Sequence, residues 1–465
     1  MCIKLNLFSM HIPNKKKVKI AIPKSLQILA NLAHCSIFIT GGFVRNHLVG
    51  LGSTDIDIAG SALPEAFLGS KKINKNFSVT EVNKRLGTLW IKCRETGELF
   101  EYTPFRTESY GEGGVHTPEE VAFTTDMLLD AKRRDFCCNA LYYDIKNSEV
   151  IDFFGGIEDC EKKMLRCWDA KYVFADDGLR LLRLARISAE TGFLIDNITK
   201  EIAISFRHHL NDITAERKRI ELERILVADT KYSIKDAHYR GLKLLYELQL
   251  FKYLIPELLE GDRLEQNKEH HIYDVLEHTF QVVRFSPPEV RLSALLHDVG
   301  KPYALKEFGK MAGHADLSEK LVRKILGSSG LKFSNEKIDE TARLCKHHMV
   351  DKDGNMSEQK LIRFAVKNWD ILDKLIALID ADRLGANPNK QHETHRLVAI
   401  KQKIIDTNVP LTLKDLKING SDLLAVGITG QNIGKILTEI HDHCILNSKL
   451  NTRDWQLEFA SRFNI

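Results

Sequence analysis

The first third of the chain carries short hydrophobic runs that are rich in β-branched and aromatic residues and are bounded by turn residues. Runs of this length and composition predict β-strands. After the first run, Gly41-Gly42 precedes a short apolar segment that Gly50 closes, which predicts a helix over residues 43–49. The predicted strands cover residues 36–40, 55–59, 87–93, 99–103 and 141–145.

From about residue 175 onward the hydrophobic positions recur with helical spacing, as Leu179, Leu182 and Ile187 do. The segment 230–405 and the residues after it read as helices with short polar breaks. This change of period predicts the α+β class, with a small mixed β-sheet domain followed by a long all-helical body. We expect five parts: an N-terminal extension at 1–20, a sheet-containing head at 21–157, a helical neck at 158–230, a helical domain at 231–400 and a tail at 401–465.

Composition narrows the class of protein further. The 465 residues carry a formal net charge of only +4, so contacts with nucleic acid have to come from local basic patches. The nine cysteines include no pair with metal-ligand spacing, which favours reduced thiols in a cytoplasmic protein. No apolar run approaches the roughly 20 residues that span a bilayer, and the N-terminal lysines follow the apolar stretch, unlike those of a secretory signal. We expect a soluble, cytoplasmic protein without membrane contact.

Asp55 and Asp57 alternate with isoleucines. On a strand, the period of two places both carboxylates on one face, about 7 Å apart. They repel each other unless a cation lies between them, and Mg²⁺ prefers carboxylate and phosphate oxygens. Gly41-Gly42 predicts a turn that offers backbone N–H groups to a phosphate, and Arg45 lies one helical turn further on. These residues predict a site for Mg²⁺ and a triphosphate, with a solvated acidic strand as the alternative.

Two arginine-containing runs follow the acidic strand. In the first, Arg134 can donate to phosphate or ribose oxygens and Asp135 can accept from a ribose hydroxyl. In the second, Asp177, Arg180, Arg183 and Arg186 are spaced by three along one predicted helix face. An acid and an arginine at the exposed start of a helix can read a base edge, because Asp177 accepts from the amino group of cytosine or adenine and Arg180 donates to the neighbouring acceptor. Solvated turns and salt-bridged helix faces are the alternative interpretations.

Histidines and aspartates gather within the predicted helical domain. His297-Asp298 lies in an apolar segment, and buried imidazoles and acids need partners. A divalent metal can be that partner, with His278 and a late aspartate completing the set. We prefer Asp382 to Asp380 as this aspartate. His314 and either His347 or His348 are candidates for a larger site.

The order of these motifs resembles that of class II CCA-adding enzymes and bacterial poly(A) polymerases, in the nucleotidyltransferase superfamily of DNA polymerase beta. The resemblance is carried by Gly41-Gly42-Phe43-Val44-Arg45-Asn46, Thr54 to Ala59, Arg133 to Leu141, Asp176 to Arg186 and the helix 214–226, and more loosely by the tail residues 413–424. Asn46 stands where an aspartate is usual, and Asp176 where a glutamate is usual. The run around His297-Asp298 resembles the HD phosphohydrolase superfamily.

The resemblance implies a polymerase-beta-like nucleotidyltransferase head and template-independent addition of CCA to the 3′ end of tRNA from CTP and ATP. Carried over, Asp55 and Asp57 hold Mg²⁺, with Glu101 on a later strand as a third carboxylate. Gly42, Arg45, Arg134 and Asp135 bind the nucleotide, Asp177 and Arg180 select CTP and ATP, and Arg183 and Arg186 contact phosphates.

Two groups of alternatives stay open. Within the same class, the alternatives are a poly(A) polymerase and a partial enzyme that adds only C or only A. In a different class, the resemblance to HD proteins implies a metal-dependent phosphohydrolase, with His278, His297, Asp298 and Asp382 holding a second divalent metal. The tail is expected to grip the outer part of tRNA.

Overall fold

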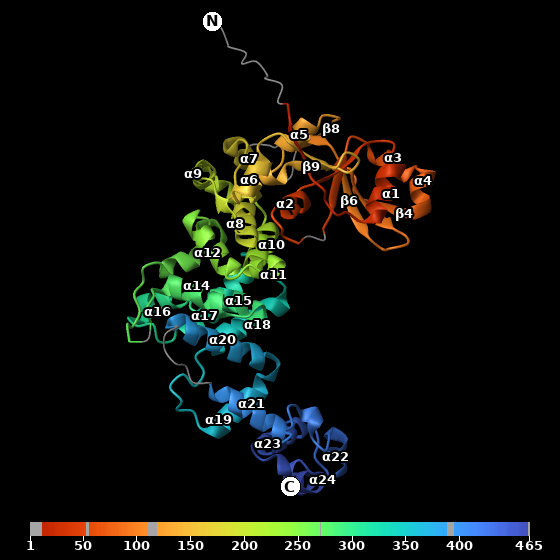
Figure 1. Cartoon of the computed structure of the whole chain (residues 1–465). Coiled ribbons are helices and arrows are strands. Elements are labelled where there is room, and N and C mark those ends of the chain that lie inside the picture. The colour runs from red at the N-terminus through yellow and green to blue at the C-terminus, as the bar shows by residue number, and fades with distance from the viewer. Residues whose placement is uncertain (1–11, 53–54, 110–118, 270, 388–394, 464–465) are drawn as a thin grey trace. The chain divides into compact units, whose positions relative to one another are not determined.

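The chain folds into two compact units, Met1–Pro256 and Glu257–Ile465. The computed structural model describes residues 12–52, 55–109, 119–269, 271–387 and 395–463 (Figure 1). The first unit contains the β-sheet and the helices that follow it, and the second unit is helical. The predicted α+β class with a sheet-containing head and a helical body is therefore confirmed.

The described part of the first unit contains an eight-stranded sheet with the strand order β1-β10-β9-β2-β3-β6-β5-β4. Only β3 and β6 pair in parallel among these described strands. The strands are β1 (Asn14–Lys17), β2 (Ile37–Thr40), β3 (Asp57–Gly60), β4 (Phe77–Asn83), β5 (Thr88–Cys93), β6 (Leu99–Pro104), β9 (Leu141–Asp144) and β10 (Glu149–Asp152). A separate hairpin joins β7 (Arg106–Ser109) to β8 (Glu120–Phe123).

The five predicted strands correspond to β2, β3, β5, β6 and β9, with two differences from the sequence-based expectation. β3 begins at Asp57, so Asp55 precedes the strand and does not share its pleat. Residues 14–17 of the predicted extension form the edge strand β1, which pairs with β10. The sequence analysis did not predict this strand, because lysines are not typical strand residues and the partner strand β10 lies far along the chain.

Short helices cover the sheet of the first unit. One face packs Phe38, Phe105, Tyr142 and Ile151 into a core with Ala131 of α5. Small residues such as Ala59 and Ala140 let the helix approach this face closely. The helices are α1 (Lys24–Leu32), α2 (Gly42–Leu48), α3 (Pro64–Leu68), α4 (Lys71–Asn76), α5 (Met127–Lys132) and α6 (Gly156–Glu161).

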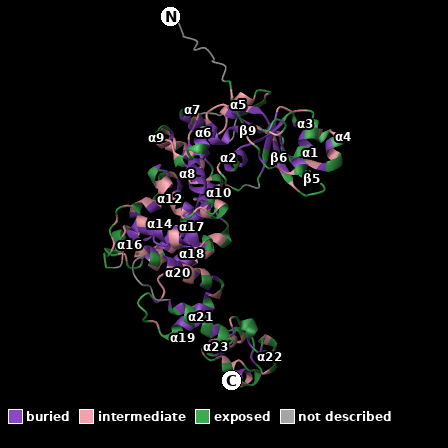
Figure 2. Cartoon of the chain, viewed as in Figure 1, coloured by how far each residue is buried: buried purple, intermediate pink, exposed green. Residues whose placement is uncertain are grey.

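Helix α8 (Leu179–Thr191) is the centre of the helical part of the first unit. It packs against α10, α11 and α12, and all but one of its residues are buried (Figure 2). A helix that is buried all round has to pair its polar residues internally. The other helices here are α7 (Ala170–Asp176), α9 (Asn197–Phe206), α10 (Ala215–Leu226), α11 (Ala228–Tyr232), α12 (Ala237–Glu247) and α13 (Phe251–Leu254), and a small parallel ladder joins β11 (Met164–Leu165) to β12 (Leu194–Ile195).

The second unit begins with a helical core in which α14 packs on α20 and α17 packs on α18. Side chains of Asp274, Ser334 and Ser357 accept backbone N–H groups at the starts of α14, α18 and α19, which fixes where these helices begin. The helices are α14 (Val275–Phe285), α15 (Arg291–Leu296), α16 (Lys301–Phe308), α17 (His314–Leu326), α18 (Asn335–His347), α19 (Glu358–Lys367), α20 (Leu372–Ala386), α21 (Arg396–Asp406), α22 (Gly420–Ala425), α23 (Asn432–Leu446) and α24 (Arg453–Ser461). Among the described helices, none is long and apolar enough to cross a bilayer.

Candidate active site

The turn between β2 and α2 brings bare backbone to the first acidic residue of β3. Gly41 has a φ of +74°, which favours glycine, and α2 begins at the next residue. A Cβ atom on Gly41 would lie 3.6 Å from Oδ2 of Asp57. Asp57 is also the register partner of Thr40, the last residue of β2. The predicted Gly-Gly turn and the predicted metal ligand are therefore neighbours.

A second carboxylate lies beside Asp57. Glu101 of β6 is the parallel register partner of Asp57, as expected for a third acid on a later strand. Enclosure by the surrounding protein and the Glu101 carboxylate raise the pKa of Asp57, with a smaller contribution from Asp55. Carboxylates crowded together in this way are a set of oxygen ligands that a divalent cation would stabilise. Asp55 lies before the strand and, with Asp57, lines a small cavity of about 140 Å³.

Arg134 is fixed by a buried acid that the sequence analysis did not single out. Asp130 on α5 is fully buried and accepts from Nε and Nη2 of Arg134, at 3.2 and 3.0 Å. It also accepts from Nε of Arg133 at 2.8 Å and from the Tyr142 hydroxyl at 2.5 Å. The spacing of three and four residues between Asp130 and the two arginines was the signal that could have found it.

Asp135 forms an ion pair with the central helix. Its Oδ2 accepts from Nη2 and Nε of Arg183, at 2.6 and 3.0 Å, and its Oδ1 accepts from Nδ2 of Asn139 at 2.9 Å. Burial raises the pKa of Asp135, but Arg183 and the hydrogen bond from Asn139 outweigh burial and hold the pKa well below its usual range. Asp135 is therefore an ionised anchor for Arg183.

The residues predicted to select the base lie at the start of α8. Oδ1 of Asp177 accepts from the backbone N–H of Leu179 at 2.9 Å. Arg180 donates from Nη1 to the Val173 carbonyl at 2.9 Å and from Nη2 to the Arg133 carbonyl at 2.6 Å. Asp177 and Arg180 are only 4% and 5% exposed, so the expectation of an exposed helix start was wrong. Packing of this turn against the segment 207–212 buries it, since a Cβ on Gly178 would lie 2.6 Å from the His209 carbonyl.

Two of the predicted phosphate-contacting arginines have partners within the protein. Arg186 donates from Nε to Glu221 at 2.6 Å and from Nη1 to Glu190 at 3.0 Å. Arg45 is buried and donates to the side chains of Asn139 and Asn46. The structure thus gives both arginines intramolecular anchors that spacing alone did not indicate.

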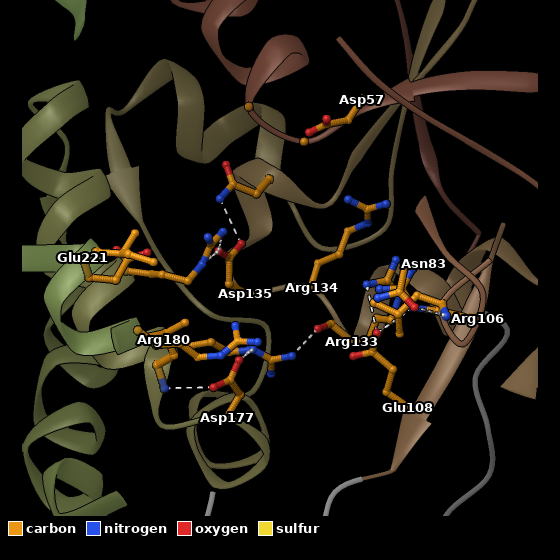
Figure 3. Close-up of a pocket in the computed structure, with 18 of the residues that line it drawn as sticks. Asp57, Asn83, Arg106, Glu108, Arg133, Arg134, Asp135, Asp177, Arg180 and Glu221 are labelled. Atoms are coloured by element: carbon orange, nitrogen blue, oxygen red, sulfur yellow. Dashed lines mark hydrogen bonds and ion pairs between the residues drawn. The ribbon is translucent and has the colours of Figure 1, made fainter. Parts of the chain in front are cut away.

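A single cavity of about 640 Å³ joins most of these groups. Figure 3 shows Asp57 at one side of this pocket, Asp177 and Arg180 at the opposite side, and Arg134 and Asp135 between them. Arginines outnumber carboxylates in the lining, so the cavity suits a polyanion. The sequence analysis missed further lining residues on the two hairpins and on α10, namely Asn83, Arg85, Arg106, Glu108, Arg217, Ile220 and Arg224.

The second unit contains the predicted histidine–aspartate cluster. Oδ2 of Asp298 lies 3.1 Å from Nε2 of His297 and 3.3 Å from Nε2 of His278. Its Oδ1 lies 3.1 Å from Nε2 of His314 and 3.6 Å from Nε2 of His348. Gly300 permits this arrangement, because a Cβ there would lie 2.3 Å from the His314 carbonyl. The cluster therefore requires close contact between the turn after α15 and the start of α17.

The structure decides between the candidates that spacing left open. Asp382 lies 3.0 Å from Nε2 of His278, whereas Asp380 is not part of the cluster among the described residues. His348 faces Asp298, and the ring of His347 contacts Phe364. The late aspartate brought to the cluster is Asp382, and the additional histidines are His314 and His348.

The chemistry of this cluster fits a divalent metal. Nε2 of His278 and of His297 and Oδ1 of Asp298 are buried without a hydrogen bond in the described structure, and Oδ2 of Asp298 has an ion pair with Lys301. Ligand atoms of His278, His297 and Asp382 lie within 4.8 Å of one another. Burial lowers the pKa of His297, but the Asp298 and Asp382 carboxylates raise it to about 10. Orphaned nitrogen and oxygen atoms that converge in a buried site are what a metal ion satisfies.

Three family models match the chain. Residues 37–166 match the Poly A polymerase head domain, which contains the Gly-Gly turn, Asp57 and the Arg134-Asp135 segment. Residues 192–261 match the RNA and SrmB-binding site of polymerase A, and residues 310–460 match tRNA nucleotidyltransferase domain 2. Over these three regions the chain is similar to class II CCA-adding enzymes and poly(A) polymerases. The match over residues 37–166 agrees with the nucleotidyltransferase head that the resemblance implied.

Individual proteins similar to this chain have related names. A CCA-adding enzyme of Bacillus pumilus is 35% identical over 251 residues, which cover 53% of this chain and 58% of that protein. A CC-adding tRNA nucleotidyltransferase of Thermus thermophilus is 29% identical over 420 residues, which cover 86% of this chain and 87% of that protein. The matches to the first few relatives thus span about half of their length.

The fold of the family extends over the whole chain. The crystal structure of the Bacillus stearothermophilus CCA-adding enzyme in complex with CTP superimposes with a TM-score of 0.66 and 20% identity. The superposition covers 95% of this chain and 98% of that one. The polymerase-beta-like head and the helical body are therefore shared at the level of fold.

Proposed function

We propose that this protein adds C, C and A to the 3′ end of tRNA, using CTP and ATP and releasing pyrophosphate. The single observation that carries the proposal is the cavity that holds Asp57 and the Gly-Gly turn together with Asp177 and Arg180. A triphosphate needs cations and N–H donors, and a base needs a fixed donor and acceptor pair. This cavity offers both within one enclosure of nucleotide size.

The reaction proposed is an in-line phosphoryl transfer. The 3′ hydroxyl oxygen of tRNA forms a bond to the α-phosphorus, and the bond from that phosphorus to the bridging oxygen of pyrophosphate breaks. Asp55, Asp57 and Glu101 would hold Mg²⁺, which increases the nucleophilicity of the hydroxyl and neutralises the leaving group. The backbone of Gly42 and the arginines of the cavity hold the triphosphate against Asp57.

Selection of the nucleotide rests on rigid protein groups, because no template strand takes part. Asp177 offers an acceptor that favours the amino group of cytosine and adenine and repels the carbonyl oxygen of uracil and guanine. Arg180 cannot swing freely, since two backbone carbonyls hold its guanidinium. A donor held in place discriminates more strongly than a mobile one, because little rotamer freedom is lost on binding.

One experiment distinguishes CCA addition from the related activities of adding only C or adding A to any RNA. One similar protein, which covers 86% of this chain, is named a CC-adding tRNA nucleotidyltransferase, and a poly(A) polymerase would use the same head. The decisive experiment supplies labelled CTP or ATP to tRNA lacking CCA, tRNA ending in CC, tRNA ending in CCA, and an unstructured RNA. Ordered addition of C, C and A followed by a stop supports the proposal. Addition of C alone, or of A to any RNA, replaces it by the corresponding partial or poly(A) activity.

A second candidate function rests on a separate observation, the buried cluster around Asp298. We infer that His278, His297, Asp298 and Asp382 hold a divalent metal, and that this unit carries an HD-type phosphohydrolase activity. Such a metal would polarise a phosphoryl oxygen and supply a hydroxide. Burial raises the pKa of Asp298, but His297 and Lys301, whose Nζ lies 2.5 Å from Oδ2 of Asp298, hold this pKa well below its usual range. Metal-dependent release of phosphate from model phosphoesters, lost in Asp298→Ala, is the test.

A further inference from the structure

An unbroken series of side-chain hydrogen bonds runs from α11 to α8. The Tyr232 oxygen accepts from Nδ2 of Asn46 at 2.8 Å, and Oδ1 of Asn46 accepts from Nη2 and Nε of Arg45 at 2.8 and 3.0 Å. Nη1 of Arg45 donates to Oδ1 of Asn139 at 2.6 Å. Asn139 donates to Asp135, which in turn accepts from Arg183. We call this series the Tyr232 chain; it consists of Tyr232, Asn46, Arg45, Asn139, Asp135 and Arg183.

The direction of every bond in the Tyr232 chain follows from Arg45. A guanidinium only donates, so the amide oxygens of both Asn46 and Asn139 must face it. The amide nitrogen of Asn139 then faces Asp135, which accepts because it is ionised. The amide nitrogen of Asn46 faces outward and needs an acceptor, which the Tyr232 oxygen provides. Reversing any one amide would oppose donor to donor.

Interior members of the Tyr232 chain have almost no access to water. Asn46 is 1% exposed, Arg45 is 4% exposed, and Asn139 and Asp135 are each 7% exposed. A buried amide that loses its partner cannot recover the bond from solvent. The chain therefore transmits a fixed geometry from its half-buried end at Tyr232 to the three members that line the nucleotide pocket, Asn139, Asp135 and Arg183.

The side-chain amide of Asn46 connects Arg45 to Tyr232. The resemblance to the family has an aspartate at this position, and a carboxylate would offer Tyr232 only an acceptor. The amide accepts from Arg45 and donates to Tyr232 at the same time. Tyr232 accepts from this amide, whereas it would have to donate to a carboxylate, and it lies beyond the motifs that the sequence analysis singled out.

We propose that Tyr232 is a positioning residue for nucleotide binding, acting through the Asn46 amide and the Arg45 guanidinium on Asp135 and Arg183. This inference rests on the proposed function, because it concerns the same pocket. Tyr232 itself does not line the larger cavity among the described residues. Its effect is therefore expected on the binding of the triphosphate and not on the choice between bases, which belongs to Asp177 and Arg180.

The test compares Tyr232→Phe with the wild type in steady-state nucleotide addition. Loss of the acceptor should raise the KM for both CTP and ATP about tenfold, the effect of one buried hydrogen bond, while the ratio of CTP to ATP use stays unchanged. Tyr253→Phe on α13 is the matched control and should leave both constants unchanged. A lower melting temperature with unchanged KM would give Tyr232 a purely structural role and overturn the proposal.

A double-mutant cycle with Asn46→Leu tests whether the effect of Tyr232→Phe on the KM acts through the Tyr232 chain or through local packing. Asn46→Leu breaks the chain one residue further in, so adding Tyr232→Phe to it should raise the KM less than twofold further. Multiplicative effects of the two substitutions would contradict coupling through this amide. Circular dichroism of each variant establishes that it is folded before kinetics are interpreted.

A measurement of nucleotide binding without RNA tests the role of Tyr232 independently of the proposed CCA addition. The dissociation constant for CTP, measured by calorimetry without RNA, should rise about tenfold in Tyr232→Phe by the same argument. If the wild type binds CTP but adds no nucleotide to any RNA, the proposed function fails and the binding measurement still decides the role of Tyr232. An unchanged dissociation constant in Tyr232→Phe overturns the positioning role alone.

Discussion

Arg183 of α8 donates two hydrogen bonds to one carboxylate oxygen of Asp135, from Nη2 at 2.6 Å and from Nε at 3.0 Å. This ion pair connects the helix that carries Arg180 with the segment that follows Arg134. Both partners line the same pocket, so the pair sets the distance between the two halves of the nucleotide site. Its charge dependence leads to a first prediction.

Asp135→Asn should weaken nucleotide addition and remove a pH-dependent part of the stability. The pKa of Asp135 is held well below its usual value of 3.8, so its contribution is complete above that value. It is lost as the pH falls toward the lower pKa of the folded state, because protonation breaks the pair. The melting-temperature difference between wild type and Asp135→Asn should therefore be largest near neutral pH and should shrink below about pH 4. A difference that stays constant down to pH 3 contradicts this assignment.

Glu101→Gln should weaken the response to Mg²⁺. Removing one of two carboxylates that face each other across β3 and β6 leaves fewer charged oxygen ligands. We expect the Mg²⁺ concentration for half-maximal addition to rise about tenfold or more, and Asp57→Ala to lower kcat by at least about a hundredfold. Titration of activity with Mg²⁺ measures both. Glu95→Gln, at the exposed turn before β6, is the matched control. An equal rise of the half-maximal Mg²⁺ concentration in this control would contradict the role of Glu101 as a metal ligand.

Asp177→Ala should relax the choice of nucleotide. The substitution removes the buried carboxylate that we propose repels uracil and guanine carbonyls, while Arg180 keeps its two backbone partners. We expect incorporation of UTP or GTP relative to CTP to rise by about ten- to hundredfold, the range of one or two polar contacts. Competition between labelled nucleotides on tRNA lacking CCA measures the ratio. Unchanged rejection of UTP would remove Asp177 from the selecting pair.

Asp298→Ala should abolish metal binding by the second unit and spare nucleotide addition. This substitution removes the carboxylate that His278, His297, His314 and His348 share. Metal content of the purified protein, measured by mass spectrometry, should fall to background. Asp380→Ala is the matched control, because Asp380 lies on the same helix two residues from Asp382. Loss of nucleotide addition in Asp298→Ala, in a folded protein, would contradict two independent sites.

The sequence predicted the strands and motifs well where local pattern decides structure. Runs such as 87–93 and 141–145 lie within a residue of β5 and β9, because short runs rich in β-branched and aromatic residues between turn residues are a local signal for strands. Glu101 is the register partner of Asp57, on the later strand where the resemblance implied a third carboxylate. Asp55 does not continue the strand, since the register of β2 with β3 ends at the pair of Thr40 and Asp57.

Partners from distant segments explain what the sequence did not predict. The spacing of Arg180, Arg183 and Arg186 suggested an exposed charged face. The structure buries Arg186 between Glu190 and Glu221 and pins Arg180 to two carbonyl oxygens. Periodicity reports which residues share a face and contains no information on the polarity of what packs against it. The Tyr232 chain escaped prediction for the same reason, because Asn46 and Tyr232 are 186 residues apart.

The edge strand β1 has a consequence for the behaviour of the protein in a crowded solution. Its four residues, Asn14–Lys17, are all exposed, and three of them are lysines. An open strand edge is a template for pairing with another chain, and a row of ammonium groups opposes that pairing by charge repulsion and by the cost of dehydration. The lysines that seemed too polar for a strand thus guard the sheet that carries Asp57 against aggregation through this edge.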